Sequence, residues 1–262
     1  MPKTVAKAKN DAKAKLQNLV RLLAYDRQHR FVGRSTKPQC ILVGTDEVGR
    51  GCFAGPVVAA AVMLPEIEEK SSLAKSLAEL NDSKKLNSVQ RERLAAIIHE
   101  IGICAIAQSS VEEINEINIL QASLMAMRRA LDQLSERLPD TMPILVLVDG
   151  NKAVTNIGPS YVQSTVIQGD STSASIAAAS IIAKVYRDQM MLQLAQEFPH
   201  YGWESNKGYG SKTHREALRQ HGMTVWHRKL FCENALYSEN VDEIARLEHL
   251  YEDETALELI SN

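Results

Sequence analysis

The sequence predicts an α/β fold in which a central sheet is flanked by helices. Short apolar runs bounded by Gly and Pro alternate along the chain with longer segments whose apolar residues recur every three or four positions. The 262 residues are 45% hydrophobic and 24% charged, a composition that supplies one large buried core. The longest apolar stretch, residues 54–64, is shorter than the roughly 18 residues that cross a membrane. These observations favour a soluble globular protein with interleaved strands and helices.

The first 38 residues predict a basic helical extension. Residues 1–38 hold ten Lys or Arg against two acids, a net charge of +8, and Leu16, Leu19 and Leu23 follow helical spacing. Residues 238–262 hold eight acids against one Arg, a net charge of −7, and predict an acidic helical tail. The basic segment suits a polyanionic partner. Two alternatives remain open, in which the tail folds back on the basic segment or both ends are solvated helices.

Residues 39–237 are the predicted α/β domain. Its strands are expected at four apolar runs, residues 41–45, 56–64, 103–107 and 144–148, and at the more alternating segment 161–167. Its helices are expected at residues 88–100, 111–138 and 172–197. Ser88 is the predicted cap of the first of these helices, and Pro139 ends the second. The run 144–148 is apolar throughout, which is typical of a strand buried on both faces.

The cysteines and the N-terminus predict the compartment. The four cysteines stand far apart, without a CxxC pair or an accompanying histidine spacing, so that neither a disulfide framework nor a zinc site is indicated. The first 15 residues lack the apolar segment of a signal peptide. We therefore expect a monomeric protein of the reducing cytoplasm that has no membrane partner.

Acidic residues follow three of the predicted strands. Asp46 and Glu47 come after residues 41–45, Asp149 after residues 144–148, and Asp170 shortly after residues 161–167. Catalytic groups of open α/β sheets gather at the strand ends, so these carboxylates are expected at one point. Such a cluster repels itself unless cations hold it together, and carboxylate oxygens suit hard ions such as Mg²⁺. Taken singly, each acid is more simply explained as a helix cap or surface turn residue.

Three further motifs supply groups that suit a sugar-phosphate. Gly49, Arg50 and Gly51 allow close backbone approach, with amides exposed as donors. The segment NDSKKL contains Ser83 and Lys84, and the segment NKGYG places a tyrosine between two glycines. Each motif on its own is also typical of a turn.

Taken together, the motifs resemble the bacterial ribonuclease HII family. The segments are DEVGRGCFAGPVVAAAV (46–62), NDSKKLN, LVDGNKAV (147–154), GDSTSASIAAASIIAKVYRD (169–188) and NKGYGS. They stand in that family's order and approximate spacing, over residues 41–226. The resemblance implies a ribonuclease H-like fold with a C-terminal helical part.

The resemblance also implies an activity and a site. The family cuts the RNA strand of RNA/DNA hybrids and nicks 5′ of ribonucleotides embedded in duplex DNA, leaving 5′-phosphate and 3′-hydroxyl ends with two divalent ions, Mg²⁺ or Mn²⁺. Its metal-binding catalytic carboxylates fall on Asp46, Glu47, Asp149 and Asp170. Its substrate-binding groups fall on Gly49, Arg50 and Gly51, which read the ribose 2′-hydroxyl, on Ser83 and Lys84, and on the junction-sensing Tyr209.

Some residues depart from the pattern or have a second interpretation. Gln168 stands where lysine is expected, and Ser211 stands where threonine is more usual. Asp188 lies four residues after Lys184, which favours a surface ion pair over a fourth metal ligand. His214 either faces the phosphate backbone or has a packing or surface role, and the second is favoured. The rival functions are a binding protein that has lost catalysis and a resolvase or transposase of the same fold, which would cut DNA without ribose.

Overall fold

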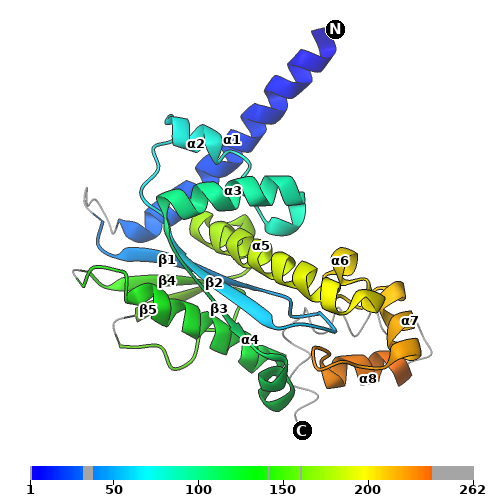
Figure 1. Ribbon diagram of the computed structural model, residues 1–262. Coiled ribbons are helices and arrows are strands. Elements are labelled where there is room, and N and C mark those ends of the chain that lie inside the picture. The colour runs from blue at the N-terminus through cyan, green and yellow to red at the C-terminus, as the bar shows by residue number, and fades with distance from the viewer. Residues whose placement is uncertain (1, 32–37, 141, 160, 238–262) are drawn as a thin grey trace.

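A five-stranded mixed sheet forms the centre of the protein (Figure 1). The computed structural model describes residues 2–31, 38–140, 142–159 and 161–237. The strands, in the spatial order β3-β2-β1-β4-β5, are β1 (Ile41–Val48), β2 (Val57–Met63), β3 (Ile103–Ser109), β4 (Ile144–Asp149) and β5 (Tyr161–Val166). Strands β1, β4 and β5 are parallel, while β2 pairs antiparallel with both β1 and β3. All five strands lie where the sequence predicts them.

The helices connect and cover the strands. The α-helices are α1 (Pro2–Arg30), α2 (Ser72–Ser76), α3 (Ser88–Ile101), α4 (Val111–Ser135), α5 (Ala174–Glu197), α6 (Trp203–Asn206), α7 (Lys212–His221) and α8 (Lys229–Tyr237). Three short 3₁₀ helices are η1 (Ser83–Lys85), η2 (Gly169–Ser171) and η3 (Pro199–Tyr201). None of the helices in the described ranges is long and apolar enough to cross a membrane. The helical tail predicted within residues 238–262 lies outside the described residues.

Two details of the helix prediction are wrong. The cap of α3 is Asn87, one residue before the predicted Ser88: its side chain accepts from the Gln90 amide, while the Gln90 side chain accepts from the Asn87 amide. The predicted helix over 111–138 ends at Ser135 and is broken at Asn118, whose φ of 65° is left-handed. The Asn118 side chain accepts from the Gln121 amide and so caps the second part of α4.

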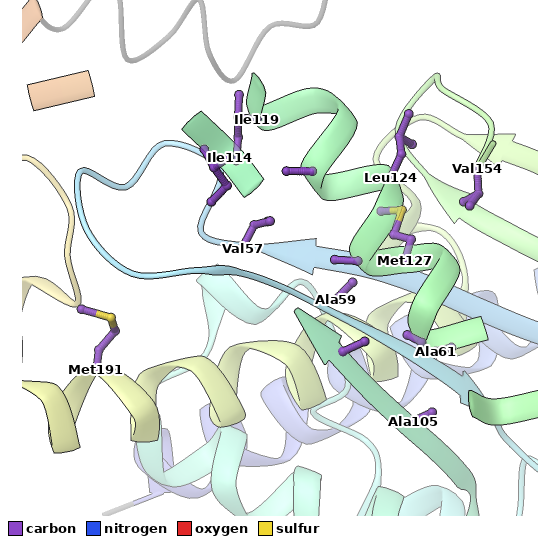
Figure 2. Close-up of a cluster of buried hydrophobic side chains, with 14 of the residues drawn as sticks. Val57, Ala59, Ala61, Ala105, Ile114, Ile119, Leu124, Met127, Val154 and Met191 are labelled. Atoms are coloured by element: carbon purple, nitrogen blue, oxygen red, sulfur yellow. The ribbon is translucent and has the colours of Figure 1, made fainter. Parts of the chain in front are cut away.

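The sheet is buried on both faces, as the apolar strands require. Alternate residues of β2 point to opposite sides: Val57, Ala59 and Ala61 pack with α4, as Figure 2 shows, whereas Val58 and Ala60 pack with the cluster that includes α1, α3 and α5. Helix α5 is buried throughout its first ten residues. It approaches β1 so closely that a Cβ on Gly44 would lie 2.2 Å from the Ser175 carbonyl carbon. This approach brings α5 beside the carboxyl end of β1.

Candidate active site

Two of the predicted acids lie side by side because the parallel pairing of β1 with β4 ends next to them. Asp46 and Glu47 lie within β1, which continues to Val48, and not after the strand as predicted. Thr45 of β1 pairs with Val148 of β4, so Asp46 and Asp149 follow at the same edge of the sheet. The turn of η2 carries Asp170 to this edge, and the Gly169 amide donates to Asp149 Oδ1 at 2.6 Å. Glu47, the last residue but one of β1, accepts from Arg50 Nη1 at 3.3 Å. All four predicted carboxylates therefore come from segments that meet at one edge.

Burial and neighbouring charges disfavour the ionisation of Asp46, Asp149 and Asp170. Burial, then the charges of Asp149 and Glu47, raises the pKa of Asp46 well above its ordinary value. Burial and the charge of Glu47 raise the pKa of Asp149 to about 6, against the opposing effect of backbone amide donors. Burial, followed by the charges of Asp82 and Asp149, raises the pKa of Asp170 to about 6. The site therefore holds more negative charge than it can stabilise alone.

A divalent cation fits the chemistry of this donor set. Carboxylate oxygens are the preferred ligands of hard cations, and a cation would offset the mutual repulsion that raises these pKa values. In the part of the chain that the structure describes, no three His, Cys, Asp or Glu side chains are gathered into a ready-made metal cage. Like charges that repel one another are expected to close around an ion only when it binds. Asp46, Glu47, Asp149 and Asp170 are the carboxylates at this edge that could hold such an ion.

Two site residues were not singled out from the sequence. The Ser180 side chain on α5 donates towards Asp46, which opposes the rise in the pKa of that carboxyl. Asp82 caps η1 by accepting from the Lys84 amide at 2.8 Å, and its charge acts on Asp170. Nothing in the sequence around Ser180 distinguishes it from the other small residues of α5. Asp82 could have been identified from the sequence, because it directly precedes Ser83 at the start of a polar turn.

The predicted residues Ser83 and Lys84 lie on different surfaces of η1. Ser83 is 4% exposed, and its hydroxyl lies 2.9 Å from that of Ser180, in the shell that supports Asp46. Lys84 is exposed, and its charge lowers the pKa of Asp170 against the stronger opposing effects. The geometry thus gives Ser83 a supporting position and leaves the ammonium group of Lys84 accessible.

The Gly-Arg-Gly loop leaves β1 directly beside the carboxylates. Gly49 has a φ of +95°, and a Cβ there would lie 2.2 Å from Arg187 Nε, so this position requires glycine. Nothing lies within 4 Å of where a Gly51 Cβ would stand, so the backbone is open to approach there. The Arg50 guanidinium pairs with Glu47 at 3.3 Å and thereby links the loop to the acidic cluster.

Two buried arginines hold this loop. Arg187 and Arg228 are fully buried, and both donate to main-chain carbonyls. Arg228 donates to the carbonyls of Arg50 (2.7 Å) and Gly55 (2.8 and 3.0 Å), and Arg187 donates to those of Ala54 (2.9 Å), Pro56 (3.0 Å) and Lys207 (2.8 Å). Neither arginine was predicted to be a site residue, because a buried arginine that binds backbone carbonyls has no local sequence signature.

Tyr209 lies next to the same loop. Cys52 forms an isolated antiparallel bridge with Tyr209, and the Phe53 amide donates to the Gly208 carbonyl at 2.8 Å. Gly208 has a φ of +87°, and a Cβ there would lie 2.5 Å from the Ala54 carbonyl oxygen, so glycine is required for this close approach. Tyr209 is 36% exposed, and Lys184 Nζ lies 6.0 Å from the centroid of its ring. The two predicted substrate-binding loops are therefore one connected surface.

A groove of about 460 Å³ runs beside Tyr209, bounded by α3, α5 and the segment 205–207.

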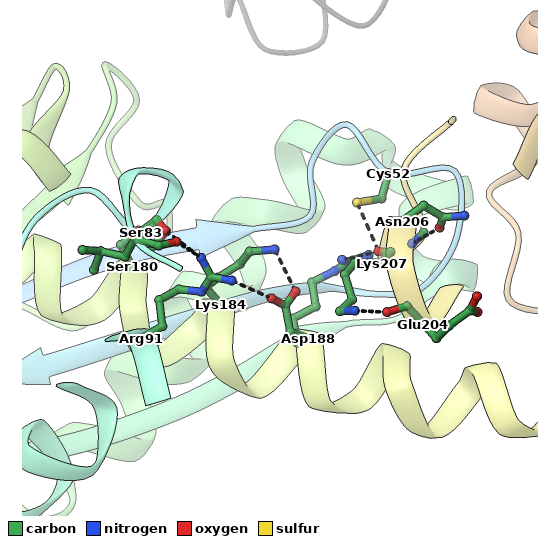
Figure 3. A network of polar contacts seen from close by, with 12 residues as sticks. Cys52, Ser83, Arg91, Ser180, Lys184, Asp188, Glu204, Asn206 and Lys207 are labelled. Atoms are coloured by element: carbon green, nitrogen blue, oxygen red, sulfur yellow. Dashed lines mark hydrogen bonds and ion pairs between the residues drawn. The ribbon is translucent and has the colours of Figure 1, made fainter. Parts of the chain in front are cut away.

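In Figure 3, Lys184 and Arg91 are both directed at Asp188. Lys184 Nζ lies 2.7 Å from Asp188 Oδ1, which confirms the predicted ion pair, and Arg91 Nη2 lies 3.5 Å from Oδ2. The pair is not at the surface as predicted, because these three side chains are only 14–16% exposed. Asp188 is therefore paired with the side chains of Lys184 and Arg91 and lies outside the acidic cluster.

His214 packs inside the protein. It is fully buried, and its Nε2 accepts from Trp203 Nε1 at 3.1 Å, so its proton resides on Nδ1 and is donated to the Tyr209 carbonyl at 2.9 Å. His227 Nδ1 accepts from the Thr224 amide, so its Nε2 donates to His214 at 3.0 Å. Burial lowers the pKa of both imidazoles, that of His227 to about 3 with a further contribution from His214. The neutral histidine pair holds the Tyr209 loop through the hydrogen bond from His214 to the Tyr209 carbonyl.

Comparison with known proteins gives a consistent result. Residues 43–234 match the family model described as Ribonuclease HII. A protein of that name from Parabacteroides distasonis is 48% identical over 192 residues, which cover 73% of this chain and 89% of the relative. The structure of "Bst-RNase HIII in complex with Mn2+" superposes with a TM-score of 0.62 at 21% identity, over 81% of this chain and 71% of that one. A chain of the PCNA:RNase HII complex from Archaeoglobus fulgidus superposes with a TM-score of 0.58 at 26% sequence identity, over 78% of this chain and 99% of that one.

Proposed function

The chain belongs to the ribonuclease HII family, and from its site we propose that it hydrolyses the RNA strand of RNA/DNA hybrids and nicks on the 5′ side of ribonucleotides embedded in duplex DNA. As a member of that family it is a divalent-metal-dependent endoribonuclease. The observation that carries the proposal is the convergence of Asp46, Asp149 and Asp170 at the edge of the sheet where the Gly49–Gly51 loop begins. The carboxylates proposed to cleave the phosphodiester thus lie next to the loop proposed to recognise the ribose.

The carboxylates would hold the catalytic ions. When bound, two divalent ions supply a Lewis acid for the attacking water and for the leaving 3′-oxygen, and we propose Mg²⁺ or Mn²⁺ in this role. Asp46 and Asp149 lie on adjacent strands, so the sheet fixes their separation. The Gly169 amide and the Ser180 hydroxyl orient these two carboxylates by donating to them. No side chain of the protein need act as a nucleophile.

The loops would select the ribonucleotide. The open backbone at Gly51 permits donors and acceptors to reach a ribose 2′-hydroxyl, which is the group that separates RNA from DNA. Arg187 and Arg228 hold this loop against the Tyr209 segment through buried hydrogen bonds. The Tyr209 ring is partly exposed, and we propose that it packs against the neighbouring deoxyribose, so that a junction between RNA and DNA is read by one rigid surface.

We further propose a monomer that acts in the cytoplasm, with residues 39–237 as the catalytic domain between a basic extension (1–38) and an acidic tail (238–262). The four cysteines are all free, which supports a reducing compartment. Ribonucleotide removal during DNA replication and repair is the process that such an activity serves.

A nicking assay tests the proposed function. Three duplexes of one sequence are compared in Mg²⁺: one with a single embedded ribonucleotide, one with a continuous RNA strand, and one of DNA alone. We expect cleavage of the first two, with a 5′-phosphate on the downstream product, and none of the third. Cutting of the all-DNA duplex would favour a resolvase-like enzyme, and binding without cutting would favour a binding protein.

A further inference from the structure

Helix α1 lies outside the residues that match the family, yet its second half is built into the protein. The match begins at residue 43, whereas α1 ends at Arg30. Leu19 and Leu22 are fully buried in the apolar cluster that includes α5. Figure 1 shows the N-terminal half of α1 projecting from the body and its C-terminal half running beside the start of α5. The second half of the helix therefore has a fixed position relative to the active site.

Asp26 on this helix binds the beginning of α5. The carboxylate is only 5% exposed: Oδ1 accepts from the Ser173 hydroxyl at 2.5 Å, and Oδ2 accepts from the amide and hydroxyl of Ser175 at 2.8 and 2.6 Å. Ser173 is itself the N-cap of α5 and accepts from the Ile176 amide at 3.2 Å. The Asp26 carboxylate satisfies a first-turn amide that has no partner within its helix, and it places negative charge where a helix N-terminus favours it.

Arg21, five residues earlier on the same helix, binds the other end of this segment. Its Nη2 donates to the Ser171 carbonyl at 2.7 Å, and Ser171 is the neighbour of Asp170 in η2. The opposite side of Asp170 is fixed through the Gly169 amide, which donates to Asp149. Residues 171–175 are thus held at both ends by α1, directly after a carboxylate of the active site.

We propose that Asp26 and Arg21 are positioning residues for the active site, which hold residues 171–175 and so orient the Asp170 carboxylate towards Asp149 and the divalent cation. This inference rests on the proposed function, since it assigns Asp170 to the metal site. Groups that orient a metal ligand typically change metal affinity by 10–100-fold when they are removed. A helix that precedes the family match thereby takes part in metal binding.

The test measures metal binding in Arg21→Gln and Asp26→Asn, with Arg27→Gln as a control. Arg27 lies on the same helix, is exposed like Arg21, and pairs with Glu66 at 3.7 Å. Its loss removes one positive charge, as the loss of Arg21 does, but leaves residues 171–175 held. Calorimetric titration with Mn²⁺ in the absence of nucleic acid gives the affinity. The Mg²⁺ concentration for half-maximal nicking and the thermal unfolding midpoint are recorded for each variant.

We expect Mn²⁺ affinity to fall about tenfold in Arg21→Gln and at least as much in Asp26→Asn, and to stay within twofold in Arg27→Gln. Saturating Mg²⁺ should restore most of the turnover of Arg21→Gln, because the ligand is misplaced rather than removed. Mn²⁺ affinity equal to that of the parent in a folded Arg21→Gln variant would overturn the proposal, even if Asp26→Asn failed to fold.

Asp170→Asn separates this inference from its premise. If Asp170→Asn binds Mn²⁺ as tightly as the parent, Asp170 is not a ligand and the site assignment itself fails. If Asp170→Asn loses affinity while Arg21→Gln and Asp26→Asn keep it, the site assignment stands and the positioning role is refuted.

Discussion

At the scale of single residues, Asp46 combines the deepest burial with the strongest mutual repulsion among the site carboxylates. It is 5% exposed, and burial together with Asp149 and Glu47 raises its pKa well above the ordinary range. Such a group is costly for folding unless a cation is present. A carboxylate held in so unfavourable a position is typical of a functional site. Substituting it therefore separates stability from activity.

We predict that Asp46→Asn lowers nicking by about a hundredfold or more in Mg²⁺, because a charged ligand that supports transition-state charge is lost. The same change should leave the unfolding midpoint unchanged or raise it, since repulsion from Asp149 is relieved. Asp132→Asn, on the exposed side of α4, is the control and should retain activity. Activity of Asp46→Asn within tenfold of the parent would contradict the metal-site assignment.

Tyr209 gives a second residue-level prediction. The residue is 36% exposed beside the Gly-Arg-Gly loop, so Tyr209→Ala should impair nicking at one embedded ribonucleotide more than cleavage within a long RNA strand. Tyr209→Phe keeps the ring and should retain most of the discrimination. The measurement is the ratio of kcat/KM on the two substrates. Equal losses on both would assign Tyr209 to general binding or folding.

At the scale of elements, α6, α7 and the segment before α8 are joined by a buried histidine pair. Trp203, His214 and His227 form one hydrogen-bonded group that ends on the Tyr209 carbonyl. Burial and the proximity of His214 lower the pKa of His227 to about 3, so this imidazole is neutral in the folded state. The element that presents Tyr209 is therefore sensitive to acid.

We predict that acid destabilises the protein partly through His227. In the unfolded chain the pKa of His227 is about 6.5, so between pH 6.5 and pH 3 the unfolded state binds a proton on this imidazole and the folded state does not. The contribution of neutral His227 to the free energy of unfolding is therefore complete above pH 6.5 and is lost as the pH falls towards 3. At pH 5 the loss is about 2 kcal/mol, at about 1.4 kcal/mol per pH unit. Urea unfolding at pH 7 and pH 5 measures it, and His227→Gln should reduce the difference. An equal pH dependence in parent and variant would refute this; His99→Gln, which is exposed, is the control.

At the scale of the whole molecule, part of the basic extension predicted from the sequence packs against the α/β domain. The basic extension predicted for residues 1–38 includes Leu19, Leu22 and Asp26, which are buried against the domain. Deleting all of it would expose core surface and would not report on charge alone. The informative deletion is residues 1–14, which carry four Lys and one Asp, a net charge of +3.

We predict that deleting residues 1–14 weakens duplex binding and flattens its salt dependence, because each lost phosphate contact removes about 0.9 from the log-log slope. Turnover at saturating substrate should be retained. Affinity measured between about 50 and 200 mM salt gives the slope. Deleting residues 238–262 should strengthen binding at low salt if the acidic tail covers the basic segment. Unchanged slopes in both variants would mean that neither end contacts the duplex.

The sequence by itself determined the order and type of the main elements. Short apolar runs are typical of buried strands, and apolar residues that recur every three or four positions are typical of helices, so all five strands and the helices α1, α3, α4 and α5 were predictable. The acids that follow strands, and the motifs that resemble a known family, were likewise local features. The break at Asn118 was not predicted, because a left-handed residue inside an otherwise helical pattern leaves the apolar spacing almost unchanged.

Only the tertiary structure decided which distant groups support the site. Arg187, Arg228 and Ser180 were not predicted, because most of their partners, which are main-chain carbonyls and the Asp46 carboxylate, lie more than 100 positions away in the sequence. The pairing of Asp26 with Ser173 and Ser175 spans 147 and 149 positions. Such contacts depend on how α1 and α5 pack on the sheet, and packing is set by the shape of the whole core rather than by any local pattern.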